Sequence, residues 1–220
     1  DWSPRRFREI GVWGRGPGSS GYRADFADLP LDVNGDRRVD IVSSDYASGE
    51  IFWHENPGPA SDALWRRHLI AKPGSAETSV LAPIVGKKAV DVLPNVAGQV
   101  VWYELREAGP NPRWVEHVVG KEGAGHGIGW GDVDGDGKTD LVTPRGWWRQ
   151  IDARADRWQW RPEFTCNPGD LGISTPVYDV DGDKRNDIVF GSGHNYGLFW
   201  LRNLGDGKWE QIAIDRSESQ

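Results

Sequence analysis

The sequence predicts an all-β fold, a β-propeller built from four-stranded antiparallel blades. Two observations favour it: an acidic loop of the pattern Asp-x-Asp/Asn-x-Asp recurs along the chain, and a tryptophan-bearing segment recurs between the loops. Four short strands in roughly 50 residues are typical of one propeller blade. We expect a single propeller region over residues 1–220, with blades at about 22–75, 76–124, 125–170 and 171–217 and a lone outer strand within 1–21.

The acidic loops predict bound cations. In the clearest copy, within 125–142, carboxylates stand at positions 1, 3, 5 and 9 of a loop that glycines allow to curl. Ca²⁺ takes six to eight oxygen ligands, including a backbone carbonyl, here expected at position 7. We expect about three structural Ca²⁺ sites, with Mg²⁺ as the alternative ion. The expected ligands are Asp32, Asn34, Asp36, Arg38 and Asp40, then Asp132, Asp134, Asp136, Lys138 and Asp140, then Asp179, Asp181, Asp183, Arg185 and Asp187.

These loops differ from EF-hands, which carry a bidentate Glu at position 12 between two helices. Position 12 is Ser43, Thr143 or Phe190, and each loop runs directly into a β-branched segment. The second repeat departs from the pattern. When Asp91 is aligned with Asp40, Lys87 occupies position 5. We therefore expect a Lys87–Asp91 ion pair there in place of a metal ion.

Two further segments recur in each repeat. The inner one is seen at 51–54, 100–103 and 198–201, with a rougher copy at 147–149. The outer one has an aromatic residue followed by a glycine nine positions later. Turn-rich linkers separate the inner segment from the outer segment. The outer segments number five, counting one that starts at Phe7, whereas the inner ones number four. Because an open ring leaves unpaired strand edges, we expect further blades of the same protein, or a dimer that completes the ring.

Composition narrows the functional classes. The net charge of −7 disfavours nucleic acid as a partner, because binding phosphates needs a basic face. No apolar run approaches the roughly 20 residues that span a bilayer. The single cysteine, Cys166, excludes an internal disulfide and suggests a buried thiol. The chain starts at Asp1 and contains no Met, so we interpret it as processed or excised, and expect a secreted, extracellular or periplasmic protein.

The Asp-x-Asp-Gly-Asp loops within all-β repeats resemble the FG-GAP/VCBS repeat family, to which the propellers of integrin α-chains belong. The resemblance covers nearly the whole chain, and 132–140 is its most specific match. It implies calcium in the three acidic loops, and it carries no ligand onto the second repeat. Within that family, the tryptophan strands and the Gly125-His126-Gly127 entry resemble the propeller of aldos-2-ulose dehydratases, which eliminate water from keto-sugars. Those enzymes carry additional cupin domains, and this chain has no cupin metal motif.

Candidate chemistry lies on the face opposite the acidic loops. Abstraction of a proton next to a carbonyl needs a base with a pKa near neutrality, and loss of water needs an acid or a metal. The candidate catalytic residues are His126, His194 and Tyr196, because both histidines break the repeat. A sugar-binding surface needs aromatic platforms and planar polar groups, for which the candidates are Asp45, Tyr46, Arg145, Trp147 and Asn195. Asp170 and Asn95 share this face.

Structural roles compete with these assignments. His68 and His117 recur at one phase of the outer strand, and the repeated tryptophans fit core positions between blades. The acidic loops would also form hydrogen-bonded Asx turns without metal. Two functions stay open: a recognition module for carbohydrate or extracellular protein, and a keto-sugar dehydratase, a carbon–oxygen lyase. The sequence favours the module, because its catalytic set is incomplete. Sequence patterns of serine or cysteine hydrolases do not occur.

Overall fold

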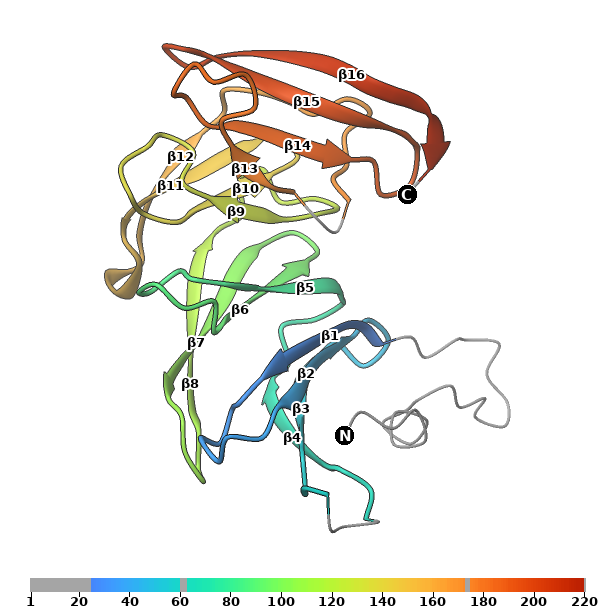
Figure 1. Cartoon of the computed structure of the whole chain (residues 1–220), viewed down its shortest axis with the longest axis vertical. Coiled ribbons are helices and arrows are strands. Elements are labelled where there is room, and N and C mark those ends of the chain that lie inside the picture. The colour runs from blue at the N-terminus through green and yellow to red at the C-terminus, as the bar shows by residue number, and fades with distance from the viewer. Residues whose placement is uncertain (1–24, 60–62, 173–174, 220) are drawn as a thin grey trace. The chain divides into compact units, whose positions relative to one another are not determined.

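A computed structural model of the chain describes residues 25–59, 63–172 and 175–219. Within these ranges the protein is almost entirely β, as the sequence predicts, and forms four antiparallel sheets of four strands each (Figure 1). In every sheet the strands are hydrogen-bonded in chain order. The predicted outer strand at Phe7 lies outside the described residues.

The first two sheets contain β1 to β8. The bounds are β1 (Asp25–Leu31), β2 (Asp40–Asp45), β3 (Glu50–Glu55), β4 (Arg66–Ala71), β5 (Ala76–Ala82), β6 (Asp91–Val96), β7 (Val100–Glu107) and β8 (Arg113–Gly120). The inner strands β2 and β6 are buried at every residue, whereas the outer strands β4 and β8 are largely part-exposed or exposed.

The third and fourth sheets contain β9 to β16, with one 3-10 helix, η1 (Ala153–Ala155), before β12. The bounds are β9 (Gly129–Gly131), β10 (Asp140–Thr143), β11 (Gly146–Asp152), β12 (Arg157–Arg161), β13 (Val177–Tyr178), β14 (Asp187–Gly191), β15 (Tyr196–Gly205) and β16 (Lys208–Ser219).

The acidic loops join the first strand to the second in three of the sheets, at 32–39, 132–139 and 179–186. Because successive strands run antiparallel, the turns between second and third strands lie at the other end of each sheet. The order of strand, acidic loop, strand, tryptophan strand and outer strand agrees with the order read from the sequence.

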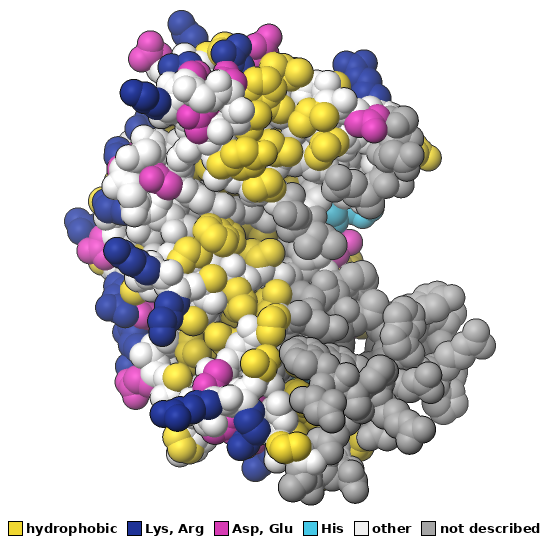
Figure 2. Space-filling view, viewed as in Figure 1, with side chains coloured by type: hydrophobic (Ala, Val, Ile, Leu, Met, Phe, Trp, Pro, Cys, Tyr) yellow, Lys and Arg dark blue, Asp and Glu magenta, His cyan; other side chains and the backbone are white. Residues whose placement is uncertain are grey.

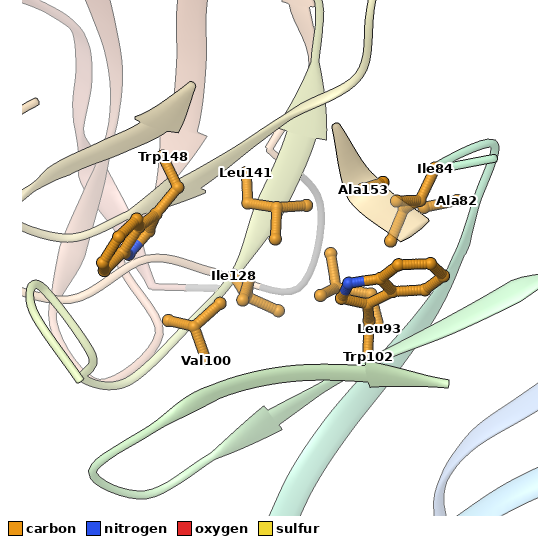
Figure 3. Packing of buried hydrophobic residues seen from close by; sticks show 9 residues of the cluster. All are labelled: Ala82, Ile84, Leu93, Val100, Trp102, Ile128, Leu141, Trp148 and Ala153. Carbon is orange, nitrogen blue, oxygen red and sulfur yellow. The ribbon is translucent and has the colours of Figure 1, made fainter. Parts of the chain in front are cut away.

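The described chain divides into two compact units. One contains the first sheet, residues up to 79, and residues 105–115; the other contains residues 80–104 and those from 116 onward. In the second unit, the residues that form the hydrophobic core come from successive sheets. Full burial of one large apolar side chain contributes roughly 1.5–3 kcal/mol. One cluster, shown in Figure 3, comprises Ala82, Ile84, Leu93, Val100, Trp102, Ile128, Leu141, Trp148 and Ala153. The other comprises Val133, Val142, Trp147, Phe164, Cys166, Leu171, Ile188, Phe190 and Leu201.

Tryptophans of the third strands in the first three sheets are buried, and a histidine stacks on one of them in each of the first two sheets. Trp53 stacks on His68 with ring centroids 4.2 Å apart, and the two residues are cross-strand partners in the first sheet. Trp102 stacks on His117 at 4.1 Å in the second unit. Nε2 of His117 faces Oε2 of the buried Glu104 at 3.3 Å. These contacts give His68 and His117 a structural role.

Cys166 is buried in the second cluster, 1% exposed. Burial, with a smaller effect from the charge of Asp170, raises the pKa of its thiol to about 12. A thiol that stays protonated is a poor nucleophile. The residue therefore acts as a small apolar side chain.

Candidate metal loops and histidine site

A buried aspartate at position 9 ties each acidic loop to its sheet. Oδ2 of Asp140 accepts the N–H of Val133 at 2.9 Å, and Oδ1 accepts the N–H of Gln150 on β11 at 2.8 Å. One carboxylate thus fixes the start of the loop to the third strand. The same pair of bonds occurs at Asp40, with Val33 and Asn56, and at Asp187, with Val180 and Asn203. We call this arrangement the aspartate clamp.

The acidic loop of the third sheet, 132–139, brings together carboxylates that the sequence predicts as metal ligands. Asp132, Asp134 and Asp136 each offer an oxygen, and these oxygens lie within 4.8 Å of one another. Backbone N–H groups hold the carboxylates in place, for example Gly137 N to Asp132 Oδ2 at 2.9 Å. Oδ1 of Asp132 is buried and has no hydrogen-bond partner among the described residues. A converging set of carboxylate oxygens with one orphaned acceptor fits a hard divalent cation.

Electrostatics at this loop also favour a cation. Burial raises the pKa of Asp140 to about 7; its two backbone hydrogen bonds oppose the rise, and the charges of Asp134 and Asp136 add to it. Arg149 of β11 partly neutralises the loop, with Nε 2.5 Å from Asp134 Oδ2 and Nη2 3.2 Å from Asp136 Oδ2. A divalent ion would offset the remaining negative charge.

The acidic loop of the fourth sheet, at 179–186, forms a second group able to hold a metal ion. The group comprises Asp179, Asp181 and the clamp residue Asp187. Asp183 is not part of this group, and its carboxylate pairs with the guanidinium of Arg185. Arg202 Nη2 lies 2.6 Å from Asp181 Oδ2, so this loop too has an arginine from the third strand of its sheet. The backbone carbonyl of Arg185 stays a predicted ligand, while its side chain contacts the carboxylate of Asp183 at position 5.

The acidic loop of the first sheet, at 32–39, does not bring three acidic side chains together. Oδ1 and Oδ2 of Asp32 accept the N–H groups of Asp36 and Arg37 at 3.1 and 3.0 Å, and the Arg38 guanidinium pairs with Asp36. Asn34 donates to Asp36 Oδ2 at 3.0 Å. Among the described residues, acidic groups able to hold a metal therefore occur in two of the three predicted loops. A third ion, at the first loop, stays a prediction.

The second repeat keeps part of the clamp without the acids. Asp91 is 1% exposed, and its Oδ2 accepts the N–H of Val85 at 2.9 Å, whereas Lys87 is exposed. The donor lies six residues before the aspartate here, but seven in the acidic loops. The alignment of Asp91 with Asp40, which assumes loops of equal length, is therefore out of register by one residue at Val85. The Lys87–Asp91 ion pair stays a prediction.

At the other end of the sheets, two histidines from different repeats meet. The rings of His126, in the loop before β9, and His194, in the turn before β15, have centroids 4.0 Å apart. Main-chain contacts anchor the first, since Leu171 N donates to His126 O at 2.9 Å and His126 Nδ1 faces Leu171 O at 3.2 Å. A Cβ at Gly193 would lie 2.3 Å from Cε1 of His126, so the approach requires glycine there.

Asp170 positions the second histidine. Its Oδ2 accepts the N–H of His194 at 2.9 Å and lies 3.5 Å from His194 Nδ1, while Ser192 Oγ donates to Oδ1 at 2.6 Å. Burial would raise the pKa of Asp170, but the bonds from Ser192 and the His194 N–H, with the charges of both histidines, lower it overall. An ionised carboxylate therefore holds the backbone of His194 and lies within ion-pair distance of its imidazole. We call His126, Asp170 and His194 the histidine site.

The other predicted site residues are divided between the two units. Asp45 caps its own turn by accepting the N–H of Ala47 at 2.9 Å, and it lies in the first unit with Tyr46, which is 50% exposed. In the second unit Arg145 and Asn195 are exposed, and Tyr196 is 67% exposed. Trp147 is only 4% exposed. The structure thus brings together His126 and His194, and the convergence of the five predicted ligand-binding residues, which the two units share, stays a prediction.

Sequence reasoning missed the roles of Asp170, Ser192 and Arg149. Asp170 had been placed on the correct face, yet its contact with His194 joins residues 24 positions apart. Only the packing of loops against one another determines such contacts. The sequence offers one signal for Asp170: it lies in a loop between repeats, directly before Leu171, whose main chain contacts His126.

No model of a known protein family matches the chain, and no curated protein matches it significantly. The likeness to FG-GAP/VCBS repeats therefore depends on the loop pattern and the blade-like sheets. Among the described residues, no helix is long and apolar enough to cross a membrane. Basic and acidic side chains are interspersed over the described part of the face shown in Figure 2.

Proposed function

We propose that the chain is part of a calcium-stabilised β-propeller of the FG-GAP/VCBS type, and that its histidine site eliminates water from a keto-sugar. Four sheets of four consecutive antiparallel strands support the propeller. Two acidic groups in equivalent loops support bound calcium. Loops of this kind suit an extracellular or periplasmic protein, where millimolar Ca²⁺ fills weak sites.

The observation that carries the proposed reaction is the pairing of His126 and His194 with an oriented carboxylate. His194, held by Asp170, removes the proton from the carbon next to the carbonyl. The hydroxyl on the following carbon leaves with a proton from His126, so that one water is released and a carbon–carbon double bond forms. Asp170 stabilises the imidazolium that His194 becomes. Calcium, when bound, supplies rigidity to the loops at the other end of the sheets.

The test is ultraviolet absorbance of a keto-sugar such as 1,5-anhydrofructose incubated with the protein. A growing conjugated-enone band is expected, and it should be abolished by His126→Ala and by His194→Ala. His68→Gln, which changes a histidine stacked on Trp53, is the matched control and should keep the band. A flat trace with the unaltered protein would overturn the proposed reaction.

A second candidate function is recognition of a carbohydrate or an extracellular protein at the same end of the sheets. Exposed Tyr196, beside Asn195, favours it, because exposed aromatic side chains are enriched at binding surfaces. This function predicts binding without turnover, weakened by Tyr196→Ala and unaffected by His68→Gln. Calorimetry with candidate glycans separates it from catalysis.

A further inference from the structure

A cavity lies between the third and fourth sheets, lined in part by residues of both acidic loops, among them Asp134 and Arg185. It has a volume of about 460 Å³ and is lined by residues of both sheets and of the segments that connect their strands. None of the histidine-site residues lines it. Its size falls within the range of about 300–1,000 Å³ typical of small-molecule sites.

One carboxylate organises the apolar wall of this cavity. Oε2 of Glu163 accepts the indole N–H of Trp147 at 3.0 Å and that of Trp209 at 3.2 Å. The two indoles come from β11 and β16, so a single acceptor fixes side chains of both sheets. Trp209 also makes an edge contact with Phe164, with ring centroids 5.2 Å apart. The wall is therefore formed before any ligand arrives.

The charged groups around the cavity balance. Three lining side chains are acidic and three are basic, and Arg161 Nη1 lies 3.9 Å from Glu163 Oε1. Among the described residues, the Lys184 ammonium and the Asp206 carboxylate have no ion-pair partner. A cavity that binds a strongly charged ligand is expected to be lined mainly by groups of the opposite charge. The mixture of donors and acceptors instead matches a neutral ligand whose groups do both.

From these features we infer that the cavity binds a neutral saccharide. A hydroxyl both donates and accepts, so it can use the acceptor Glu163 and the donor Lys184 alike. The partly exposed indole of Trp209 offers apolar surface to the C–H face of a sugar ring, with the buried indole of Trp147 behind Glu163 as its support. This site goes beyond the proposed dehydratase, because it shares no residue with the histidine site.

The experiment is saturation-transfer NMR with four neutral disaccharides as probes: maltose, cellobiose, lactose and sucrose. We expect at least one to receive saturation from the protein, and its affinity to fall at least tenfold in Glu163→Gln. That change keeps an oxygen for both indole N–H groups while removing the charge. Lys184→Ala and Asp206→Asn alter exposed residues and should each weaken binding about threefold or more.

Lys121→Ala is the matched control, since Lys121 is an exposed lysine of the same unit that does not line the cavity. Saturation of no probe would overturn the inference. So would binding whose affinity is the same in Glu163→Gln, Lys184→Ala and the unaltered protein. Enone formation at the histidine site is measured separately, so failure of one proposal leaves the other standing.

Discussion

The loops at 83–91 and 132–140 occupy the same place in consecutive repeats, yet only the second is acidic. Both end in a buried aspartate whose Oδ2 accepts a backbone N–H at 2.9 Å. Only the second gathers three carboxylate oxygens within 4.8 Å. The comparison separates two roles that the sequence pattern merges. At 132–140 the aspartate clamp builds the loop, and the carboxylates at positions 1, 3 and 5 add the capacity for a cation, whereas at 179–187 the clamp residue Asp187 belongs to both sets.

The largest expected effect comes from removing the clamp. Asp140→Ala leaves the buried N–H groups of Val133 and Gln150 without their acceptor, at about 1–3 kcal/mol each, or about 2–6 kcal/mol together. Asp91→Ala should destabilise by a comparable amount per lost bond. Urea denaturation in excess chelator measures both, because the clamp acts without metal. A loss below about 1 kcal/mol for either variant would break the comparison.

Calcium removal should separate the two loops. At a free calcium concentration of 100 times the Kd, one ion stabilises the fold by about 2.7 kcal/mol. Chelation should therefore lower the Tm of the unaltered protein. Asp132→Asn combined with Asp134→Asn and Asp136→Asn should remove one bound calcium in equilibrium dialysis and shrink the Tm shift.

Lys87→Ala, in the loop without acids, is the control and should bind as much calcium as the unaltered protein. A Tm that does not change in excess chelator would defeat the proposal of structural calcium.

The strand order and the acidic loops were predictable because spacing and residue type encode them locally. The clamp was not, since the sequence marks Asp140 only as a metal ligand and nothing in it shows the two hydrogen bonds to the backbone. Arg149 was missed for a similar reason. It stands on the third strand and reaches Asp134 only through the register of the folded sheet.

The histidine site was predicted in part. His126 and His194 stood out because they break the repeat, whereas nothing local marks Asp170 as the partner of His194. The cavity between the third and fourth sheets was not predicted at all. Glu163 meets Trp209 across 46 residues, and such a contact leaves no periodic pattern in the sequence.

Glycine at the turn should matter equally in both loops. Gly86 has φ of +92° and Gly135 has φ of +78°, and a Cβ at either would meet no atom within 4 Å. Alanine therefore costs only the strain of the left-handed backbone, about 1–2 kcal/mol. Urea denaturation in chelator measures the free energy of unfolding of both variants. Equal losses for Gly86→Ala and Gly135→Ala would show that the left-handed turn forms in the same way with and without the acidic side chains of the loop. A loss confined to Gly135→Ala would contradict this.

Arg149→Ala should have the smallest effect and should change direction with calcium. The guanidinium is part-exposed and pairs with Asp134 and Asp136, so its loss in chelator should cost about 0.2–1 kcal/mol. A bound cation competes for the same oxygens, and removing the arginine relieves that competition. Calcium affinity at this loop should therefore rise by up to about fivefold, the equivalent of about 1 kcal/mol. Arg157→Ala, which removes a pair with Asp152 at 3.0 Å in the same sheet, should leave calcium affinity unchanged. If Arg149→Ala instead weakens calcium binding, the arginine assists binding of the ion and has to be counted as part of the cation site.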